Sequence, residues 1–355
     1  MFGLFKQDAL LPLMGVDFGS QTIKAVTLSG CVDQFYIDSV AEIATPKGGL
    51  VDYQLQDIER VSQSLKSLKR LLPSNGRFVA TAVTGANVIT KVIQLDVTLS
   101  EKELEAQIQL EAEQIIPFPL DEVSLDFEVL SFRRDSEFRQ QEILLSAART
   151  ESVNGRVTAL NEAGMMVKVM DVGAHALGRA VMTCFPKLYE INTPVGVMDI
   201  GASTITFIVL LLGQVIYSRL QNFGGDTYSQ AIASFYGIST EEAEHAKVKG
   251  TLPEGYEVNV LVPHISALIQ QARRNVQLFC SASGYRELGQ LVLTGGGSLL
   301  PGLVSKIKDE VNYEVVQPDP FMLFAKSHSD QRREDGAKYM TAFGLALRSF
   351  SPCLI

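Results

Sequence analysis

Two segments about half a chain apart share one pattern, and this internal repeat limits the fold more than any other feature of the sequence. The first runs from Gly15 to Val26 and the second from Val197 to Ile208. Each reads as an apolar strand, the motif Asp-x-Gly-x-x-Thr-Ile and another apolar strand, which is typical of a β-hairpin with a tight turn. Because such a hairpin opens each half of a 355-residue chain, we expect a duplicated unit with smaller inserted blocks.

The repeated motif suits the binding of a phosphate. A glycine turn lets phosphate approach the backbone, and turn amides and hydroxyls can donate to its oxygens. Asp17 and Asp199 would repel phosphate unless a Mg²⁺ stands between, held through waters. Two such hairpins facing each other would hold a polyphosphate from both sides, whereas the alternative is two ordinary hairpins with solvated aspartates. The hydroxyl donors are Ser20, Thr22, Ser203 and Thr204.

A third glycine-rich segment lies late in the chain, from Gln290 to Leu303. It reads as a buried strand, three consecutive glycines and a helix start, for which Ser298 is a plausible N-cap. The glycines leave room for a flat ligand against the backbone. Leu300 stands where a dinucleotide-binding Gly-x-Gly-x-x-Gly would need its last glycine, and no Walker motif is present.

Composition excludes several classes of protein. The chain is 46% hydrophobic and 20% charged, which indicates a folded protein, and its net charge of −9 argues against binding to nucleic acid or to an anionic membrane. The longest apolar run, Ile205 to Leu212, is too short to span a bilayer, and Met1 to Leu13 lacks the pattern of a secretory signal. We therefore expect a soluble cytoplasmic protein. The scattered cysteines (Cys31, Cys184, Cys280 and Cys353) and histidines suggest neither disulfides nor a metal site.

The two hairpins and the segment from Thr294 to Gly302 resemble the phosphate-1, phosphate-2 and adenosine motifs of the superfamily that contains actin, Hsp70 and sugar kinases. A narrower resemblance, running nearly end to end, is to the PilM family, which comprises actin-like, FtsA-related proteins of type IV pilus assembly. The segments that carry it are Thr90–Leu95, Leu99–Leu104, Gln114–Val123, Phe223–Asp226 and Ala342–Arg348.

The resemblance implies an α/β fold of the actin-like, ribonuclease H-like duplicated kind, with two lobes and an FtsA-type 1C insert in place of actin's 1B. The implied division is 1–84 with 167–190 for the first lobe core (1A), 85–166 for the insert (1C), 191–222 with 291–355 for the second lobe core (2A), and 223–290 for a small subdomain (2B). The insert sequence is compatible with a helix that starts at a Ser100–Glu103 capping box and ends at Pro117, followed by strands at 124–130 and 142–147.

The resemblance also implies the ligand, ATP or ADP with Mg²⁺, and its site. Lys24 could reach phosphate or face solvent. Glu244 and Lys247 match a helix beside the adenosine, although their spacing alone fits a surface ion pair. The implied metal residues are Asp17 and Asp199. The implied nucleotide-binding residues are Gly19, Ser20, Gln21, Thr22, Lys24, Gly201, Ala202, Ser203, Thr204, Gly224, Gly225, Asp226, Glu244, Lys247, Gly295, Gly296, Gly297 and Ser298.

One departure from the superfamily bears on catalysis. Actin-like ATPases hold the attacking water with an acidic or amide side chain after the insert, and here the aligned position is Gly173, with Asp171 assigned to the end of a strand. Without a water-positioning side chain we expect nucleotide binding with weak or no hydrolysis. No catalytic residue is assigned.

By resemblance, the chain is expected to be an ATP-binding scaffold of the inner-membrane type IV pilus platform, peripheral to the membrane through its partners. The main partner would be the cytoplasmic N-terminal tail of PilN, in a groove between 1A and 1C, together with other platform and motor ATPase proteins. A homodimer is also compatible with the sequence. Ile115, Ile116 and Phe118 could line that groove, but we expect them in the core of 1C.

Three other classes of protein are compatible with parts of the sequence. An FtsA-like division protein would end in an amphipathic membrane helix, whereas Arg348–Ile355 is short and contains a proline; Met1–Phe5 with Lys6 leaves room for weak membrane contact. A type II secretion platform component is a close relative in the same class. A superfamily kinase would need a catalytic base, for which the sequence offers only Asp199.

Overall fold

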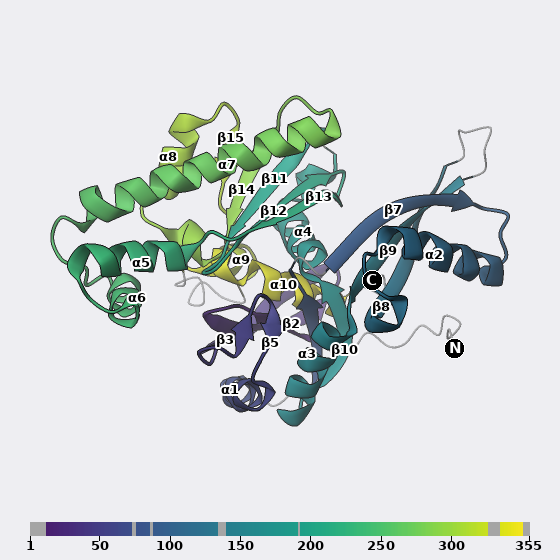
Figure 1. Cartoon of the computed structure of the whole chain (residues 1–355), viewed down its shortest axis with the longest axis horizontal. Helices are drawn as coiled ribbons and strands as arrows, with labels where there is room; N and C mark the ends of the chain where they lie inside the picture. Colours follow the sequence, from purple (N-terminus) through teal and green to yellow (C-terminus); the bar gives the residue numbers. More distant parts are fainter. Residues whose placement is uncertain are drawn as a thin grey trace.

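The computed structural model describes residues 12–72, 76–85, 88–133, 140–190, 192–325 and 334–350. Figure 1 shows two lobes, one above the other, and a third unit that projects to the right. The sequence features at Met1–Lys6 and Cys353–Ile355 lie outside the described residues. The other three cysteines are free.

The sheet of the first lobe is built on the first repeated hairpin. Its strand order is β10-β6-β1-β2-β3, in which β1, β2 and β3 are antiparallel neighbours, β6 runs parallel to β1, and β10 runs parallel to β6. The strands are β1 (Met14–Phe18), β2 (Thr22–Cys31), β3 (Gln34–Ala44), β6 (Phe78–Val83) and β10 (Met166–Val172).

The sheet of the second lobe repeats this topology strand for strand, in the order β13-β12-β11-β14-β15. The two hairpins even share their register, because Phe18 pairs with Ile23 and Ile200 pairs with Ile205. The duplication expected from the sequence is therefore confirmed. The strands are β11 (Val195–Ile200), β12 (Ile205–Leu211), β13 (Gln214–Gln221), β14 (Gln290–Thr294) and β15 (Glu314–Val316).

Helices cover both sheets and fill the space between them (Figure 1). The first lobe holds α1 (Ile58–Arg70), α3 (Thr150–Glu162), α4 (Gly173–Cys184) and the short hairpin β4–β5 (Leu50–Val51, Gln54–Leu55). The second holds α5 (Gly225–Tyr236), α6 (Thr240–Lys249), α7 (Val262–Ser283) and α8 (Leu303–Glu310). Two helices late in the chain, α9 (Pro320–Leu323) and α10 (Met340–Ala346), pack on the sheet of the first lobe: the Ile37 amide of β3 donates to the Phe324 carbonyl (2.8 Å), and a Cβ at Gly15 of β1 would stand 2.0 Å from the Ala342 carbonyl oxygen. Shorter helical turns are η1 (Leu120–Glu122), η2 (Pro186–Tyr189), η3 (Glu257–Leu261), η4 (Gly296–Leu299), η6 (Gly336–Tyr339) and η7 (Leu347–Ser349).

The two lobes share one hydrophobic core where α4 and α10 meet. This core joins Val26 of β2 to Ile208 of β12 through Val181 of α4 and Phe343 of α10. The close approach depends on glycine, because a Cβ added at Gly344 would stand 1.8 Å from the Ala176 carbonyl oxygen. A methyl group at this point would have to separate the two helices.

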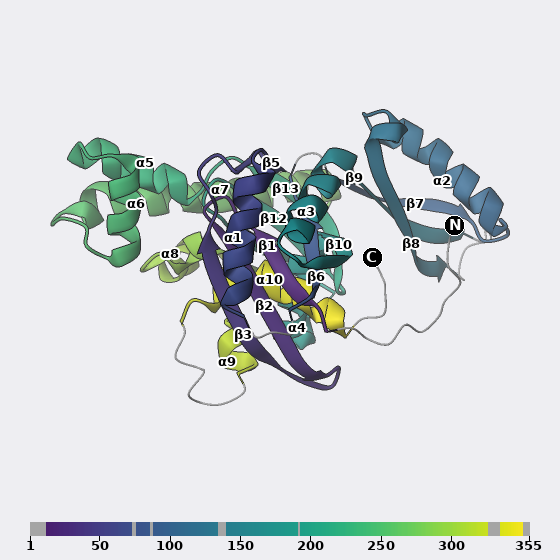
Figure 2. The same cartoon turned by 90° about the horizontal axis from the view of Figure 1, so that it is seen from below.

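The third unit lies between β6 and α3 in the chain and has its own sheet, ordered β7-β9-β8 and fully antiparallel. Figure 2 shows α2 lying along one face of this sheet. The predicted Ser100–Glu103 capping box is present at the start of α2. The elements are β7 (Val88–Asp96), α2 (Glu101–Ile115), β8 (Val123–Arg133) and β9 (Gln140–Arg149).

The core of the third unit lies between the sheet and α2. Ile116 is buried there, and Ile115 and Phe118 pack against the same cluster, so the expectation that these residues belong to the core of the unit is confirmed. Among the described residues of the unit, no helix lies over the opposite face of the sheet, and Val92 on that face is 46% exposed. We call this the open face; by strand alternation it carries Thr90, Val92, Asp126, Glu128, Leu144 and Ser146.

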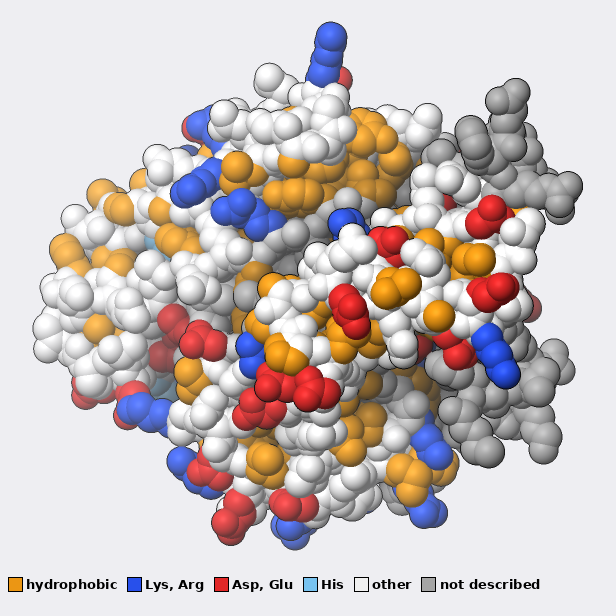
Figure 3. Space-filling view, turned by 45° about the vertical axis from the view of Figure 1, so that its right-hand side comes forward, with side chains coloured by type: hydrophobic (Ala, Val, Ile, Leu, Met, Phe, Trp, Pro, Cys, Tyr) orange, Lys and Arg blue, Asp and Glu red, His pale blue; other side chains and the backbone are white. Residues whose placement is uncertain are grey.

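The distribution of charge on the surface bears on which partners the protein can bind. On the face shown in Figure 3, Lys and Arg side chains lie among acidic and apolar ones and form no broad basic surface. Among the residues that the structure describes, no helix combines the length and the apolar character that crossing a bilayer demands.

The four-part division of the chain into 1A, 1C, 2A and 2B, which the resemblance implies, stays a prediction.

Candidate functional site

The turns of the two repeated hairpins meet, one from each lobe. Each is a tight turn, closed by a hydrogen bond from the Gly19 amide to the Thr22 carbonyl (3.1 Å) and from the Gly201 amide to the Thr204 carbonyl (2.8 Å). Between the turns, the Ser203 hydroxyl lies 3.0 Å from the Ser20 hydroxyl. We call this place the hairpin junction, formed by residues 19–22 and 201–204. The sequence predicted that the hairpins would face each other.

The glycines at the junction are required by the turns themselves. A Cβ at Gly19 would stand 2.6 Å from the Thr22 carbonyl oxygen, and one at Gly201 would stand 3.0 Å from the Thr204 carbonyl oxygen. With no side chain at these positions, the turn backbone is open to a ligand from the other lobe's side.

Two carboxylates stand behind the turns, at the ends of β1 and β11. Burial raises the pKa of Asp199 to about 6, with a further contribution from the nearby Asp17, while the hydrogen bond from Thr294 (2.9 Å) opposes the shift. Burial likewise raises the pKa of Asp17, although Lys24 and Arg156 oppose the shift. The structure therefore brings the two predicted metal residues together in a setting that disfavours their charged forms.

These two carboxylates fit a magnesium ion bound together with a phosphate. Mg²⁺ prefers oxygen ligands, and its charge would offset the cost of burying two anions. In the described part of the chain, no group of three or more His, Cys, Asp or Glu side chains could form a complete cage. A cation here would thus take its remaining ligands from waters and from phosphate oxygens, as Mg²⁺ commonly does.

Lys24 points toward the first turn. Lys24 of β2 is the residue opposite Asp17 of β1 in the register of the hairpin. Its Nζ lies 3.4 Å from the position that a Cβ on Gly19 would occupy. Of the two orientations considered from the sequence, the structure shows the one in which the ammonium group lies beside the turn.

The Gly224–Asp226 segment starts α5 directly against the second turn. The Gly225 amide donates to the Gly201 carbonyl (3.0 Å) and the Asp226 amide donates to the Ala202 carbonyl (2.8 Å). Asp226 also accepts a hydrogen bond from the Gln21 side chain of the first lobe (2.9 Å). The predicted third contributor to the phosphate site thus lies at the hairpin junction.

Glu244 and Lys247 form an ion pair (2.5 Å), as their spacing on α6 allows. The pair is not a fully exposed one, because the two side chains are only 28% and 18% exposed. Lys247 Nζ also donates to the Ser229 hydroxyl (2.8 Å) and to the Gly225 carbonyl (3.3 Å), which ties α6 to the start of α5. Contact of this pair with a nucleotide stays a prediction.

The glycine run packs against the end of β11. Gly295 has a φ of +83°, and Cβ atoms at Gly295 and Gly297 would stand about 2.5 Å from atoms of Ile200. The expectation that Ser298 is a helix N-cap is wrong. Ser298 lies in η4, where its hydroxyl donates to the Gly295 carbonyl (2.7 Å), and α8 begins later with Gly302 at its N-cap. Ser298 also lines a cavity of about 500 Å³ on the α8 side.

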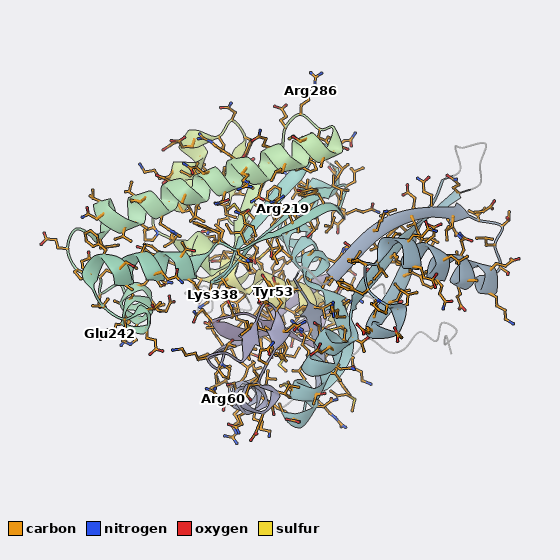
Figure 4. All side chains as sticks on the ribbon, viewed as in Figure 1. Tyr53, Arg60, Arg219, Glu242, Arg286 and Lys338 are labelled. Carbon is orange, nitrogen blue, oxygen red and sulfur yellow. The ribbon has the colours of Figure 1, made fainter. Side chains whose placement is uncertain are left out.

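The structure adds residues that sequence reasoning did not find. Tyr53, in the two-residue turn between β4 and β5, hydrogen-bonds the Thr204 hydroxyl of the other lobe. Lys338, close to Gly296, forms ion pairs with Glu42 (2.6 Å) and Asp335 (2.9 Å). Figure 4 shows Tyr53 and Lys338 where the two lobes meet. Neither residue lies in a recognisable motif, and the contacts of Tyr53 with Thr204 and of Lys338 with Glu42 join segments far apart in the chain.

Gly173 opens α4 at a place that has no room for a side chain. A Cβ there would stand 2.4 Å from the Thr84 hydroxyl oxygen. Asp171 ends a strand, as expected, and is fully buried, where its carboxylate pairs with Arg179 (3.0 Å) and Arg348 (3.6 Å). Asp171 is therefore held by two arginines.

Comparisons with known proteins agree with this geometry. The profile of the family described as type IV pilus assembly protein PilM matches residues 15–350. The chain is similar to the structure titled PilM-PilN type IV pilus biogenesis complex, with a TM-score of 0.82 and 28% identity over 97% of this chain and 100% of that chain.

More distant similarities also extend over most of the chain. Ethanolamine utilization protein EutJ of Carboxydothermus hydrogenoformans has a TM-score of 0.58 and 18% identity, covering 95% of this chain and 89% of that chain. Cell division protein FtsA of Bacillus subtilis (strain 168) is 22% identical over 374 residues, covering 94% of this chain and 82% of the relative. The predicted actin-like, two-lobed fold is confirmed.

Proposed function

The chain belongs to the family of type IV pilus assembly protein PilM, and on that premise we propose that it is a nucleotide-binding scaffold of a type IV pilus platform that holds the cytoplasmic tail of PilN. The observation that carries the nucleotide part is the hairpin junction, where two glycine turns and two buried carboxylates from different lobes converge. The likeness to a PilM–PilN complex over nearly the whole chain supports the partner.

In this proposal ATP or ADP binds with Mg²⁺ at the hairpin junction. Turn amides and the hydroxyls of Ser20 and Ser203 donate to the phosphates, Lys24 adds a positive charge, and Asp17 and Asp199 hold the cation through waters. Gly295–Ser298 and the Glu244–Lys247 pair are the proposed contacts of the adenosine. The protein carries a net charge of −9, so these local donors and the cation must make the site favourable for an anion.

The proposed place for the PilN tail is between the first lobe and the open face of the third unit. Burial raises the pKa of Glu128 on that face, although the positive charges of Arg348 and Arg179 in the first lobe act to lower it. The open face is thus turned toward lobe residues and is partly covered. Val92 and Leu144, which are paired on neighbouring strands, give this face an apolar centre for a peptide.

Val92→Glu is expected to weaken binding of a synthetic PilN N-terminal peptide at least tenfold, because it buries a charge under the peptide. The measurement is fluorescence anisotropy with the labelled peptide, with and without ATP and Mg²⁺. Leu110→Glu is the matched control, since Leu110 is 53% exposed on α2, which packs on the other face of the sheet. Equal loss in both variants, or no peptide binding by the unaltered protein, would refute the proposed groove.

Hydrolysis is expected to be slow. Gly173 offers no side chain to position water, and the Thr84 hydroxyl fills the space beside it. In a phosphate-release assay we expect turnover far below the 1–100 s⁻¹ that is typical of kinases. Turnover in that range, lost on Asp199→Ala substitution, would contradict the scaffold proposal.

We further propose that the protein is held at the inner membrane through PilN and other platform or motor proteins. FtsA-like division proteins are relatives at 22% and 20% identity, and the family match favours pilus assembly over that role. A liposome flotation assay without PilN tests this, since the proposal expects no flotation.

A further inference from the structure

We propose that the Tyr53 hydroxyl recognises the terminal phosphate of a bound nucleoside triphosphate and gives the protein a preference for the triphosphate over the diphosphate. This rests on the proposed nucleotide site. The residue reaches the hairpin junction from outside every motif that marks that site, and its contact is with the second turn, on the opposite lobe.

The backbone around Tyr53 is held in a conformation that tyrosine rarely adopts. Asp52 and Tyr53 form the two-residue turn between β4 and β5 with φ values of +47° and +64°. Such turns normally use Asn-Gly, because a bulky side chain is strained in the left-handed region. Strain of this kind persists where the surrounding structure enforces it and is concentrated at functional sites.

Two neighbours enforce the position. The buried Arg156 donates from Nη2 to the Tyr53 carbonyl (2.8 Å) and from Nη1 to the Ser152 carbonyl (2.9 Å), which fixes the turn to α3. The Tyr53 ring lies on Gly85, where a Cβ would stand about 3.0 Å from the tyrosine side chain. The hydrogen bond from Arg156 to the backbone and the packing of the ring on Gly85 therefore hold the phenol in an orientation that points to the second turn.

The chemistry at the end of the phenol is suited to an anion. Burial raises the pKa of Tyr53 to about 12, with the charges of Asp199 and Asp17 adding to the shift, so the hydroxyl is neutral and keeps its proton at neutral pH. It bonds the hydroxyl of Thr204, a residue of the predicted phosphate-2 turn. A phosphate oxygen is a stronger acceptor than a threonine hydroxyl, because hydrogen bonds to charged groups are shorter and stronger.

The position selects the outermost phosphate. Gly85 follows Thr84, whose hydroxyl faces Gly173, the position aligned with the water-holding group of actin-like ATPases. Because water attacks the terminal phosphate, the alignment implied by the resemblance puts that phosphate on the Thr84–Gly85 side of the site, and the Tyr53 ring lies on Gly85. The proposed contacts of the adenosine are other residues, Gly295–Ser298 and the Glu244–Lys247 pair. A diphosphate would leave the terminal position empty and Tyr53 bonded to Thr204.

The test is calorimetric titration of Tyr53→Phe with a non-hydrolysable ATP analogue and with ADP, both with Mg²⁺. We expect affinity for the analogue to fall about tenfold and affinity for ADP to change less than twofold. Tyr189→Phe is the matched control, because Tyr189 is 55% exposed and lies in η2. Tyr53→Asn gives a second variant that lacks the phenol but suits the left-handed turn.

The possible results separate this proposal from the proposed function. If the unaltered protein binds neither nucleotide, the proposed function fails. If it binds both and Tyr53→Phe loses affinity for both alike, or for neither, the recognition of the terminal phosphate by Tyr53 is overturned. Loss of the preference in both Tyr53 variants, with Tyr189→Phe unchanged, supports it.

Discussion

Asp199→Asn is expected to make the nucleotide-free protein more stable at pH 7.5 while weakening Mg²⁺-dependent nucleotide binding about tenfold or more. Burial holds the pKa of Asp199 at about 6, so at pH 7.5 the folded protein carries a charge in a setting that disfavours it. Removing that charge is expected to add about 1–3 kcal/mol to the free energy of unfolding. The Asn side chain keeps an oxygen that can accept the hydrogen bond from Thr294.

The sign of the pH dependence follows from the raised pKa. Between pH 4 and 6 the folded state holds a proton on Asp199 that the unfolded state has released, so the stability of the unaltered protein falls as pH rises through this window. Above about pH 6 the difference between the proteins is constant, and below pH 4 it vanishes.

Thermal unfolding from pH 4 to 8 without nucleotide measures this effect, and calorimetry with ATP and Mg²⁺ measures binding. Asp309→Asn, at an exposed position near the end of α8, is the matched control and should change neither quantity. Parallel stability curves for Asp199→Asn and the unaltered protein across this pH range would contradict the buried-charge account.

Gly344→Ala is expected to destabilise the protein by about 2–3 kcal/mol, although alanine is normally the better helix residue. The new methyl would stand 1.8 Å from the Ala176 carbonyl oxygen, which belongs to the backbone of α4 and cannot rotate away. The helices would have to separate, and the core that both lobes share would lose contacts.

Gly155→Ala is the matched comparison. This glycine is also inside a helix, α3, but its added methyl would meet only the Leu55 side chain at 3.8 Å, an ordinary contact. Here we expect no loss, or a gain of up to about 1 kcal/mol. Denaturant midpoints of the two variants should move in opposite directions, and equal shifts would show that α4 and α10 can separate freely.

The sequence predicted what is local and repeated. The Asp-x-Gly-x-x-Thr-Ile motif determines a hairpin within a dozen residues, so both hairpins and their common register were predictable from the pattern. The Ser100–Glu103 capping box predicted the start of α2 for the same reason. In each case the residues that decide the structure are neighbours in the chain.

The features that the sequence predicted wrongly, or did not predict, depend on unusual backbone conformations and on contacts between distant parts of the chain. Ser298 looked like an N-cap, but the left-handed Gly295 turns the chain into η4 first. Tyr53 occupies a turn position that local rules give to Asn or Gly, and its partner Thr204 is 151 residues away. Asp171 was predicted correctly to lie at a strand end, but no residue near it in the sequence indicates that Arg348 forms an ion pair with it.

The chain leaves the first lobe for the third unit through Thr84 and Gly85, which touch Gly173 and Tyr53. One of the two covalent links between the first lobe and the third unit thus begins beside Tyr53, which contacts the hairpin junction. In the proposed function, a nucleotide that moves the Tyr53 ring would also act on Gly85, against which that ring lies, shortly before β7 begins. Thermodynamic reciprocity then applies: whatever factor the nucleotide imposes on the affinity for the PilN tail, the tail imposes equally on the affinity for the nucleotide. In the proposed function, recruitment to a pilus platform would thereby change the equilibrium affinity of the protein for its nucleotide.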